Sequence, residues 1–447
     1  MSLTALTAGL AAWSTDPDEL ARVSVDRSGA VPDGVPDLVV FAKNVEDVRR
    51  TVAHAARHGV PVVPRGAGSG VAGGALAGAG SIVLDLSGLD RIVELLPDEA
   101  IAVVEPGVIT ADLDAAATAH GLRYAPDPAS AAFSTIGGNI ATNAGGLRCV
   151  KYGVTRDAVL AVDAVLGDGT LVRTGRRTIK GVTGYDLTGL LVGSEGTLGV
   201  IVGATVRLSP LPTSTATAAA FFATARDAVA AVTAVQRRGL RPSTAELLDQ
   251  ATLVAIDQAR GTDLHTRGEV FLLVQTDGYG AEAEMAEVDR VVRPLATAFE
   301  TTTDPEVADR LVATRRAALP AIERHGRVLI EDIAVPRSRL AESITEIGAI
   351  ADRTGVRIFV FAHAGDGNLH PIVAADSAPP EQVDRAVAAI FEHALAVGGT
   401  LTGEHGVGVL KRPWLAAELG EPLLDLHRRV KAVFDPAGVL NPGKAVR

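Results

Sequence analysis

Hydrophobic positions near the N-terminus alternate between short apolar runs and a helical pattern. The run at 38–41 predicts a strand, and apolar residues from Val45 onward recur at helical spacing. Asn44 is typical of a helix N-cap, and Gly59 is typical of the residue that ends a helix. A second apolar run at 60–64 leads into a glycine-rich stretch. The predicted order is therefore strand, helix, strand and glycine loop.

The glycine loop contains the pattern G-x-G-x-x-G at Gly68, Gly70 and Gly73. In nicotinamide-binding Rossmann folds this pattern opens a helix, whose N-terminus meets the pyrophosphate. Residues 73–86 lead into another strand instead, which disfavours a Rossmann site. Backbone N–H groups of a glycine loop can still bind phosphate as a nest without a helix.

A second glycine-rich stretch covers residues 126–153. Ordinary surface connections are rarely that long. Small residues let the backbone approach a large ligand closely, so we expect a loop that wraps a cofactor, with a plain surface connection as the alternative.

The pattern changes near Pro210 and Pro212, which mark a domain boundary. Beyond it, amphipathic helices around 225–238 and 281–299 alternate with strands at 269–277 and 357–363. This alternation predicts an α+β second domain with an antiparallel sheet.

Composition narrows the class of protein. A chain of 447 residues is long enough for two domains. The formal charge of -11 disfavours nucleic acid or an anionic membrane as the main partner.

The single cysteine, Cys149, excludes an iron–sulfur cluster that is held by cysteines of this chain alone. The opening MSLTALTAGLAAW lacks the features of a signal peptide, and no apolar run is long enough to span a membrane, so we expect a cytoplasmic protein.

The clearest chemical signal is the segment from Val356 to Val373. Asp366-Gly367 is typical of a two-residue hairpin turn, and a turn there pairs His363 with His370. Paired side chains on neighbouring strands have Cβ atoms roughly 4.5 to 5.5 Å apart, close enough to share one metal ion. The alternative is a pair of solvated or core histidines without a ligand.

A third ligand is available in GEHGVG, where Glu404 and His405 lie between two glycines. A loop of this kind can bring adjacent side chains together, whereas in a strand they point to opposite faces. His363, His370 and Glu404 form a set of two histidines and one carboxylate, which suits Zn²⁺ and leaves Mn²⁺ and Fe²⁺ open.

Six motifs together carry a family resemblance: PRGAGSGVAGG, PDPASAAFSTIGGNIATNAGG, GSEGTLGVI, AHAGDGNLHP, GEHGVG and FDPAGVLNPGK. Across roughly residues 35–447 the chain resembles the FAD-linked oxidases of the vanillyl-alcohol-oxidase type. Within them it is most similar to the branch of D-lactate dehydrogenases, glycolate oxidase flavin subunits and D-2-hydroxyglutarate dehydrogenases.

The resemblance implies an α+β fold with a two-subdomain FAD-binding domain and a substrate domain built on an antiparallel sheet. The expected organisation is an N-terminal helical segment (1–34), the FAD-binding domain (35–213), the substrate domain with the metal site (214–430) and a C-terminal segment returning to the FAD domain (431–447).

The resemblance also implies FAD contacts and points to the same three metal ligands. The first glycine loop holds Ser69 and no histidine that could attach the flavin, so FAD is expected to bind non-covalently. The implied FAD contacts are Arg65, Gly66, Ala67, Gly68, Ser69, Gly70, Pro128, Ser134, Thr135, Gly138, Asn139, Ala141, Asn143, Glu195, Gly199 and Ile201.

A mechanism follows from these residues. A D-2-hydroxy acid would chelate the metal through its hydroxyl and carboxylate, His405 would accept the hydroxyl proton, and FAD would supply the hydride acceptor at N5, leaving a 2-keto acid. By resemblance, Arg315 binds the substrate carboxylate, with Arg316 an open alternative. Either arginine could instead be an ordinary surface charge.

Two positions bear on the substrate. Relatives that act on hydroxyglutarate carry a lysine and an asparagine where this chain has Ile330 and Ile372. An apolar pocket favours a monocarboxylate such as lactate, with D-2-hydroxyglutarate or glycolate as alternatives. Phe361, Trp414 and Tyr185 are candidate pocket walls, although core packing explains each equally well.

Three matters stay open. A metallohydrolase with the same histidine and glutamate ligands is one alternative function, and a non-catalytic FAD-binding subunit of a larger complex is another. A separate electron acceptor is expected: a quinone, a cytochrome or an electron-transfer flavoprotein, with oxygen least favoured. The oligomeric state, for which a homodimer is one option, does not follow from the sequence.

Overall fold

The computed structural model describes residues 6–178 and 180–446. The first part of MSLTALTAGLAAW, on which the expectation about a signal peptide rests, therefore lies outside the described residues. The chain divides into two compact units. Unit 1 comprises residues 1–146, 153–211 and 404–447, and unit 2 comprises residues 147–152 and 212–403. Among the described helices, none combines the length and the apolar character that crossing a membrane requires.

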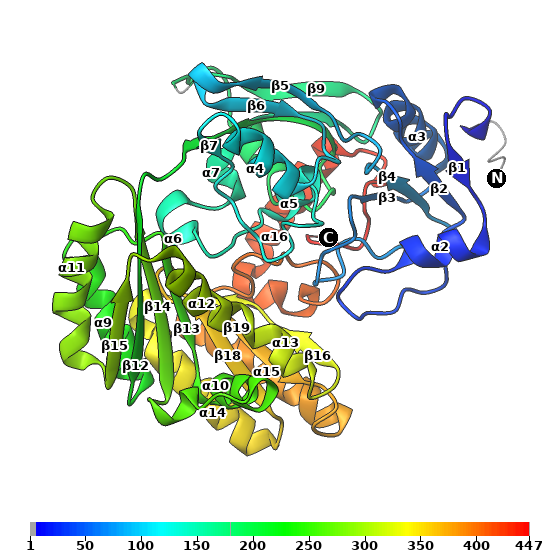
Figure 1. The fold of residues 1–447 in the computed structure, drawn as a ribbon. Helices are drawn as coiled ribbons and strands as arrows, with labels where there is room; N and C mark the ends of the chain where they lie inside the picture. The colour runs from blue at the N-terminus through cyan, green and yellow to red at the C-terminus, as the bar shows by residue number, and fades with distance from the viewer. Residues whose placement is uncertain (1–5, 179, 447) are drawn as a thin grey trace. The chain divides into compact units, whose positions relative to one another are not determined.

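Unit 1 begins with a four-stranded sheet in the order β1-β2-β4-β3. Its strands are β1 (Trp13–Ser14), β2 (Leu38–Phe41), β3 (Val62–Arg65) and β4 (Ile82–Asp85). Helix α3 (Val45–His58) joins β2 to β3. The Asn44 side chain accepts from the Asp47 backbone N–H at its start, and Gly59 ends it with a φ of 66°. The predicted order of strand, helix and strand is confirmed (Figure 1).

The glycine stretch after β3 runs directly to β4, and the described chain forms no helix between these two strands. Both β2 and β3 pair with β4 in parallel. The sequence argument against a Rossmann site is therefore confirmed, because the helix that such a site needs is replaced by a strand.

A second sheet in unit 1 has five antiparallel strands in the order β5-β6-β10-β8-β9. They are β5 (Ile92–Leu96), β6 (Ile101–Val104), β8 (Val159–Val165), β9 (Leu171–Gly175) and β10 (Val200–Arg207). Helices α4 (Thr110–Thr118) and α5 (Ile136–Thr142) bury Leu113, Ala117, Ile136 and Ile140 in the same hydrophobic core as Val162 and Val206. This core places the second glycine-rich stretch against the sheet.

The remaining helices and strands of unit 1 are mostly short, except α16 (Leu415–Phe434). The others are α2 (Pro17–Ser24), β7 (Leu122–Arg123), α7 (Thr155–Ala158), α8 (Leu187–Leu191) and β11 (Ser209–Pro210). After α16, the Val62 backbone N–H donates to the carbonyl of Val439, and the Asn441 N–H donates to the carbonyl of Val62. The C-terminal segment thus lies along β3.

Unit 2 is built on one eight-stranded sheet in the order β15-β12-β14-β13-β18-β19-β16, with β17 also paired to β19. All of its pairings are antiparallel. The strands are β12 (Thr215–Phe222), β13 (Thr244–Leu248), β14 (Val270–Asp277), β15 (Ala298–Thr302), β16 (Val328–Ile330), β17 (Ile333–Ala334), β18 (Ile358–His363) and β19 (Asn368–Ala374). The predicted antiparallel sheet is confirmed.

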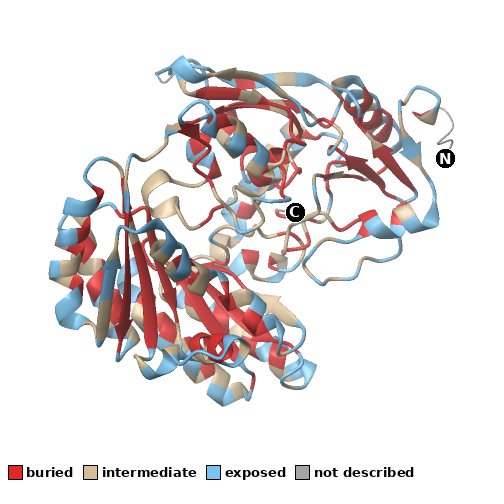
Figure 2. Ribbon diagram, in the orientation of Figure 1, coloured by how far each residue is buried: buried red, intermediate tan, exposed pale blue. Residues whose placement is uncertain are grey.

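Helices cover this sheet, and its central strands are buried almost throughout (Figure 2). The helices are α6 (Cys149–Tyr152), α9 (Ala225–Arg237), α10 (Gln250–Arg260), α11 (Ala281–Val292), α12 (Pro305–Arg316), α13 (Ala318–Glu323), α14 (Leu340–Thr354) and α15 (Pro380–Ala396). Apolar residues of α10, α12 and α13 share one core with Leu248, Phe361 and Ile372. The sheet face that carries these three residues also carries the candidate site.

Two features of the layout differ from the sequence-based expectations. The helix predicted around 281–299 ends at Val292, because Pro294 lies in a short 3-10 turn and Ala298–Thr302 forms a strand. The predicted boundary near 213 is close to the transition between units at Leu211, whereas the chain returns to unit 1 at Glu404 and not at Lys431.

Candidate active site

His363 and His370 lie on the hairpin formed by β18 and β19, but not in the predicted register. His363 pairs with Asn368, and His370 pairs with Phe361. The turn has four residues because the N–H groups of both Asp366 and Gly367 donate to the carbonyl of His363. The predicted direct pairing of His363 with His370 across a two-residue turn is therefore wrong.

The register error leaves the two histidines on the same face. A shift of two residues preserves the alternation of side chains along a strand, so the imidazoles become diagonal neighbours. Their ring centroids lie 5.1 Å apart at an interplanar angle of 88°. Ligand nitrogen atoms of the two rings lie within 4.8 Å of each other, so one ion can contact both.

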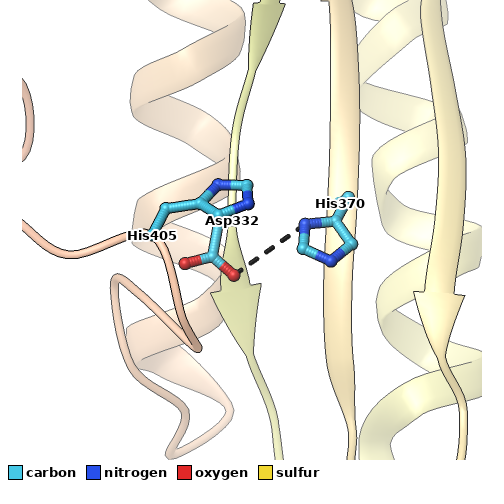
Figure 3. A group of neighbouring side chains, drawn as sticks. All are labelled: Asp332, His370 and His405. Atoms are coloured by element: carbon cyan, nitrogen blue, oxygen red, sulfur yellow. Dashed lines mark ion pairs between the residues drawn. The ribbon is translucent and has the colours of Figure 1, made fainter. Parts of the chain in front are cut away.

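Each imidazole has a buried carboxylate beside its Nδ1. Glu246 of β13 places Oε1 2.6 Å from Nδ1 of His363. Asp332, between β16 and β17, places Oδ1 3.9 Å from Nδ1 of His370 (Figure 3). Both carboxylates have an exposed fraction of 0%. Histidines that bind metals usually make a hydrogen bond with a carboxylate through the other ring nitrogen, and His363 makes such a bond with Glu246. The 3.9 Å between His370 and Asp332 is an ion-pair distance, too long for a hydrogen bond.

Sequence reasoning did not single out these two carboxylates as functional residues. A signal existed for Glu246, since a charged residue inside the apolar strand Thr-Ala-Glu-Leu-Leu is seldom buried without partners. The sheet pairing that brings β13 beside β18 is not visible in the local pattern.

Asp332 also holds the segment that leads to Glu404. Its Oδ2 accepts from the Thr402 hydroxyl at 2.6 Å and from the Gly403 N–H at 2.8 Å. Gly403 lies so close to Asn368 that a Cβ there would be 2.4 Å from Nδ2. Glu404 and His405 come next in the sequence and are the first residues of the C-terminal part of unit 1, residues 404–447. His405 is labelled in Figure 3.

Arg315 and Arg316 have different environments at the end of α12. Arg316 is exposed, whereas the Arg315 side chain is buried, with its Nε 2.8 Å from Oε2 of Glu246 and its guanidinium carbon 4.4 Å from the centre of the Phe361 ring. Across the described residues, the Nη atoms of Arg315 donate to no protein acceptor. Arg315 is therefore the better placed of the two to bind a carboxylate in this unit.

The surroundings of the histidines are apolar on one side. Ile372 is fully buried in the core that contains Phe361, and Ile330 packs against it. Tyr185 has an exposed fraction of 94%, so it is neither a core residue nor a pocket wall. Trp414 belongs to unit 1 and is not placed relative to the histidines.

In unit 1, the first glycine loop presents a row of backbone donors. Over residues 66–74, which are all described, no backbone N–H group donates a hydrogen bond to another protein atom. Nine successive backbone donors without a protein acceptor are available to phosphate oxygens. This row fits the pyrophosphate of a dinucleotide, and it includes Gly66, Ala67, Gly68, Ser69 and Gly70.

The Arg65 side chain supports this loop from within the protein. Its Nη1 donates to the carbonyls of Val23 and Val25 at 3.2 and 2.7 Å. A Cβ on Gly68 would lie 2.1 Å from Nη2 of Arg65, so the guanidinium packs directly against the loop. Burial lowers the pKa of Arg65, an effect that Asp85 and Asp26 oppose.

The side chains of the second stretch mostly hold that stretch together. The Thr135 hydroxyl accepts from the Gly138 N–H and lies against Gly66, where a Cβ would be 2.3 Å away. The Asn139 amide donates to the Thr110 hydroxyl at 2.6 Å. The two glycine-rich stretches therefore meet in unit 1, as one cofactor wrapped by both would require.

The other residues implied along this stretch have internal contacts too. The Ser134 hydroxyl lies 3.1 Å from that of Thr110, and the carbonyl of Ala141 accepts from the Glu195 N–H. Asn143 accepts from the Arg156 N–H through its side chain. The carbonyl of Pro128 accepts from the N–H of Ala131. Their contacts with FAD stay predictions.

Glu195 connects this region to the GEHGVG loop. Its carboxylate accepts from the N–H groups of Val407 and Gly408 at 2.7 and 2.8 Å. Burial raises the pKa of Glu195, while these hydrogen bonds and the charges of Lys411 and Lys444 oppose the change. Glu195 thus fixes the loop that carries Glu404 and His405.

Of the remaining implied FAD contacts, Ile201 lies in the hydrophobic core and Gly199 packs near Leu191. Glu404 lies against the second glycine-rich stretch, because a Cβ on Gly145 would be 2.2 Å from its Oε2. Unit 1 therefore gathers the proposed cofactor loops and the proposed third metal ligand around one set of glycines.

Comparisons with known proteins agree with this arrangement. A family model described as FAD binding domain matches residues 36–175, and one described as FAD linked oxidases, C-terminal domain, matches residues 211–445. The chain is 41% identical to glycolate oxidase subunit GlcD of Bacillus subtilis, with 92% of this chain and 89% of that protein covered. It is 35% identical to the mitochondrial D-lactate dehydrogenase [cytochrome] of Arabidopsis thaliana, with 92% and 74% covered.

Solved structures show the same fold at low identity. The chain superposes on p-cresol methylhydroxylase with a TM-score of 0.81 at 16% identity, covering 99% of this chain and 95% of that one. A 4-ethylphenol oxidase from Gulosibacter chungangensis gives a TM-score of 0.77 at 18% identity, covering 99% and 96%. The α+β fold of the vanillyl-alcohol-oxidase type is thereby confirmed, and the chain belongs to the FAD-linked oxidases, a family of flavin-dependent oxidoreductases.

Proposed function

We propose that this protein is an FAD- and metal-dependent dehydrogenase that oxidises a D-2-hydroxy monocarboxylate to the corresponding 2-keto acid. The observation that carries the proposal is the buried pair His363 and His370, with buried carboxylates 2.6 and 3.9 Å from their Nδ1 atoms, on the sheet face that Arg315 of α12 contacts through Glu246 and Phe361. Related proteins named as glycolate oxidase subunit and D-lactate dehydrogenase support the class of substrate.

Glu404 is the proposed third metal ligand. It follows Gly403, whose N–H is bound by Asp332, the carboxylate beside His370. Two histidines and one carboxylate leave coordination positions for a substrate and suit Zn²⁺, with Mn²⁺ and Fe²⁺ as alternatives. When bound, FAD supplies a hydride acceptor and the metal ion supplies a Lewis acid for the substrate oxygen atoms.

The protein side chains have separate roles in this proposal. Arg315 binds the substrate carboxylate through its Nη atoms, because its Nε already donates to Glu246. His405 accepts the hydroxyl proton at an imidazole nitrogen as the general base. Phe361, whose ring lies 4.4 Å from the guanidinium carbon of Arg315, supplies apolar surface that excludes water beside the substrate carboxylate.

The apolar surroundings favour a monocarboxylate. Ile330 and Ile372 cannot bind a second carboxylate, and leaving that charge unpaired in an apolar pocket would be costly. D-Lactate is the simplest substrate of this kind. Glycolate remains the alternative, supported by the relative that is 41% identical, and D-2-hydroxyglutarate is the less favoured one.

The sequence left two other functions open, a metallohydrolase and a non-catalytic FAD-binding subunit. We reject the metallohydrolase because the chain belongs to the FAD-linked oxidases. A non-catalytic FAD-binding subunit would not need His363, His370 and Arg315 arranged around two buried carboxylates, so we favour a catalytic chain. Because this chain has only Cys149, electrons are proposed to leave the flavin for a separate acceptor such as a quinone, a cytochrome or an electron-transfer flavoprotein.

The proposal is tested by mixing the purified flavoprotein anaerobically with D- and L-2-hydroxy acids and recording flavin absorbance. We expect bleaching with D-lactate, slower or no bleaching with L-lactate, and weak bleaching with D-2-hydroxyglutarate. Glycolate, which has no stereocentre at C2, is the matched comparison for pocket size. A flavin that no 2-hydroxy acid reduces would reject the proposed activity.

A further inference from the structure

Glu246 is a buried carboxylate whose two oxygen atoms bind two different partners. It lies on β13 with an exposed fraction of 0%. Oε1 is 2.6 Å from Nδ1 of His363, and Oε2 is 2.8 Å from Nε of Arg315. A carboxylate with no access to water needs such partners, so Glu246, Arg315 and His363 form one buried group.

The contact with His363 selects one form of the imidazole. An ionised carboxylate only accepts hydrogen bonds, so Nδ1 of His363 must carry the hydrogen. In a neutral ring the lone pair then lies on Nε2, so Nε2 is the nitrogen that can bind a metal. Glu246 therefore prepares His363 as a ligand before an ion is present.

The contact with Arg315 orients the guanidinium. The Nε bond to Glu246 and the Phe361 ring, 4.4 Å from the guanidinium carbon, together fix its plane. The Nη atoms, which have no protein acceptor among the described residues, are left for a substrate carboxylate. A lysine at this position could not be held in this way, because it lacks the planar fork.

We propose that Glu246 is a positioning residue that couples the metal site to substrate binding, by setting the tautomer of His363 and the orientation of Arg315 with one carboxylate. This inference rests on the proposed function, in which His363 binds metal and Arg315 binds substrate. Metal binding by His363 and substrate binding by Arg315 then both depend on Glu246, and both are weakened when Glu246 is changed.

The informative variant is Glu246→Gln, which keeps the size of the side chain. A glutamine has one acceptor and one donor group, so it cannot accept from both Arg315 and His363. If its oxygen faces Arg315, its NH₂ faces Nδ1 of His363 and favours the wrong tautomer for binding metal through Nε2. If it is turned around, the NH₂ opposes the Nε–H of Arg315 and releases the guanidinium.

Asp277→Asn is the matched control. Asp277 is a buried carboxylate on the neighbouring strand β14, and it accepts from Lys151 and from the Tyr152 hydroxyl. Neither partner is assigned to metal or substrate. The control therefore reports the effect of removing any buried carboxylate from this sheet.

Three measurements test the inference: the affinity of the metal-free flavoprotein for Zn²⁺ by competition with a chromophoric chelator, the ring ¹⁵N shifts of His363, and KM for D-lactate. We expect Glu246→Gln to weaken Zn²⁺ binding by about 10- to 100-fold, to change the His363 tautomer without metal, and to raise KM. Asp277→Asn should leave all three near the wild-type values.

The outcomes separate this inference from the proposed function. If the wild type binds Zn²⁺ and Glu246→Gln binds it equally well with the same His363 tautomer and KM, the role of Glu246 is rejected while the metal site stands. A wild type that binds no Zn²⁺ rejects both. If Glu246→Gln does not fold, Glu246→Asp replaces it; the shortened carboxylate cannot reach both partners, and unchanged Zn²⁺ affinity and KM would reject the coupling.

Discussion

The glycine loops of unit 1 and the histidine and carboxylate group of unit 2 present binding groups in opposite ways. In unit 1 the donors are backbone N–H groups of residues 66–74, and side chains such as Arg65 and Thr135 support the loops from behind. In unit 2 the candidate ligands are side chains of strands, and other buried side chains orient them. One region depends on backbone shape and the other on side-chain chemistry.

This difference predicts two kinds of mutational sensitivity. A backbone site tolerates the loss of a side chain but not an added Cβ where the packing leaves no space. A side-chain site fails when a ligand or a proton acceptor is removed, even if the fold is unchanged. The GEHGVG loop combines both, since Glu404 lies against Gly145 and the loop backbone binds Glu195.

His405→Ala should have the largest effect, because it removes the proposed proton acceptor. We expect turnover with D-lactate to fall by about 10²- to 10⁴-fold. FAD and metal content should stay at wild-type levels, since His405 is not among the proposed ligands. Steady-state kinetics with flavin absorbance and elemental analysis check this prediction. Turnover close to the wild-type rate would remove His405 from the chemistry.

Gly145→Ala should reduce activity by a smaller factor. The added Cβ would lie 2.2 Å from Oε2 of Glu404, and that side chain can only move away by leaving its position. If Glu404 binds metal, Zn²⁺ affinity should fall by about 10- to 100-fold while FAD stays bound. Competition titrations measure the affinity. An unchanged affinity would show that this position of Glu404 is not needed for metal binding.

Gly66→Ala and Ser69→Ala form a pair that tests the backbone site. The Cβ added by Gly66→Ala would meet the Thr135 hydroxyl at 2.3 Å and disturb the junction of the two loops, so FAD affinity should fall by about 10-fold, a loss of about 1.4 kcal/mol. Ser69→Ala removes a hydroxyl and leaves the N–H groups in place, so its FAD affinity should match the wild type. Fluorescence titration of the apoprotein distinguishes the two; a larger loss in Ser69→Ala would contradict a backbone site.

Glu195→Gln should give the smallest effect, of about 1 kcal/mol in the free energy of unfolding, because the amide NH₂ cannot accept from Val407 or Gly408, whereas both oxygens of a carboxyl group can accept in either protonation state. Burial raises the pKa of Glu195, so the folded state holds its proton to higher pH than the unfolded state. The stability contributed by Glu195 is thus full below the ordinary carboxyl pKa and is lost as pH rises through the raised value. Denaturation experiments at several pH values measure the difference in the free energy of unfolding between the wild type and Glu195→Gln. We expect this difference to become smaller as pH rises; a difference that becomes larger would mean that folding lowers the pKa of Glu195.

Local patterns predicted much of this molecule. Asn44 and Gly59 delimit α3 because capping depends on residues close in sequence. The strand predicted after the glycine loop correctly indicated that the loop is not a Rossmann site. The shared face of His363 and His370 was also predicted, since it depends only on the alternation of side chains along a hairpin.

Other features depend on contacts that local patterns do not record. The turn at Asp366 and Gly367 widened to four residues because both N–H groups bind the carbonyl of His363. Glu246 reaches His363 only because β13 pairs with β18, more than a hundred residues later in the chain. The role of Arg65 in supporting the glycine loop likewise depends on the carbonyls of Val23 and Val25.

The central claim is that a metal ion at His363, His370 and Glu404 is required for flavin reduction by a 2-hydroxy acid. The most direct measurement is the anaerobic rate of flavin bleaching by D-lactate, before and after the metal is removed with a chelator and after Zn²⁺ or Mn²⁺ is returned. We predict bleaching in the metal-loaded protein, a loss of at least about 10²-fold without metal, and recovery on reloading, while His370→Ala stays slow throughout. Equal rates with and without metal, with FAD bound in both samples, would contradict the account.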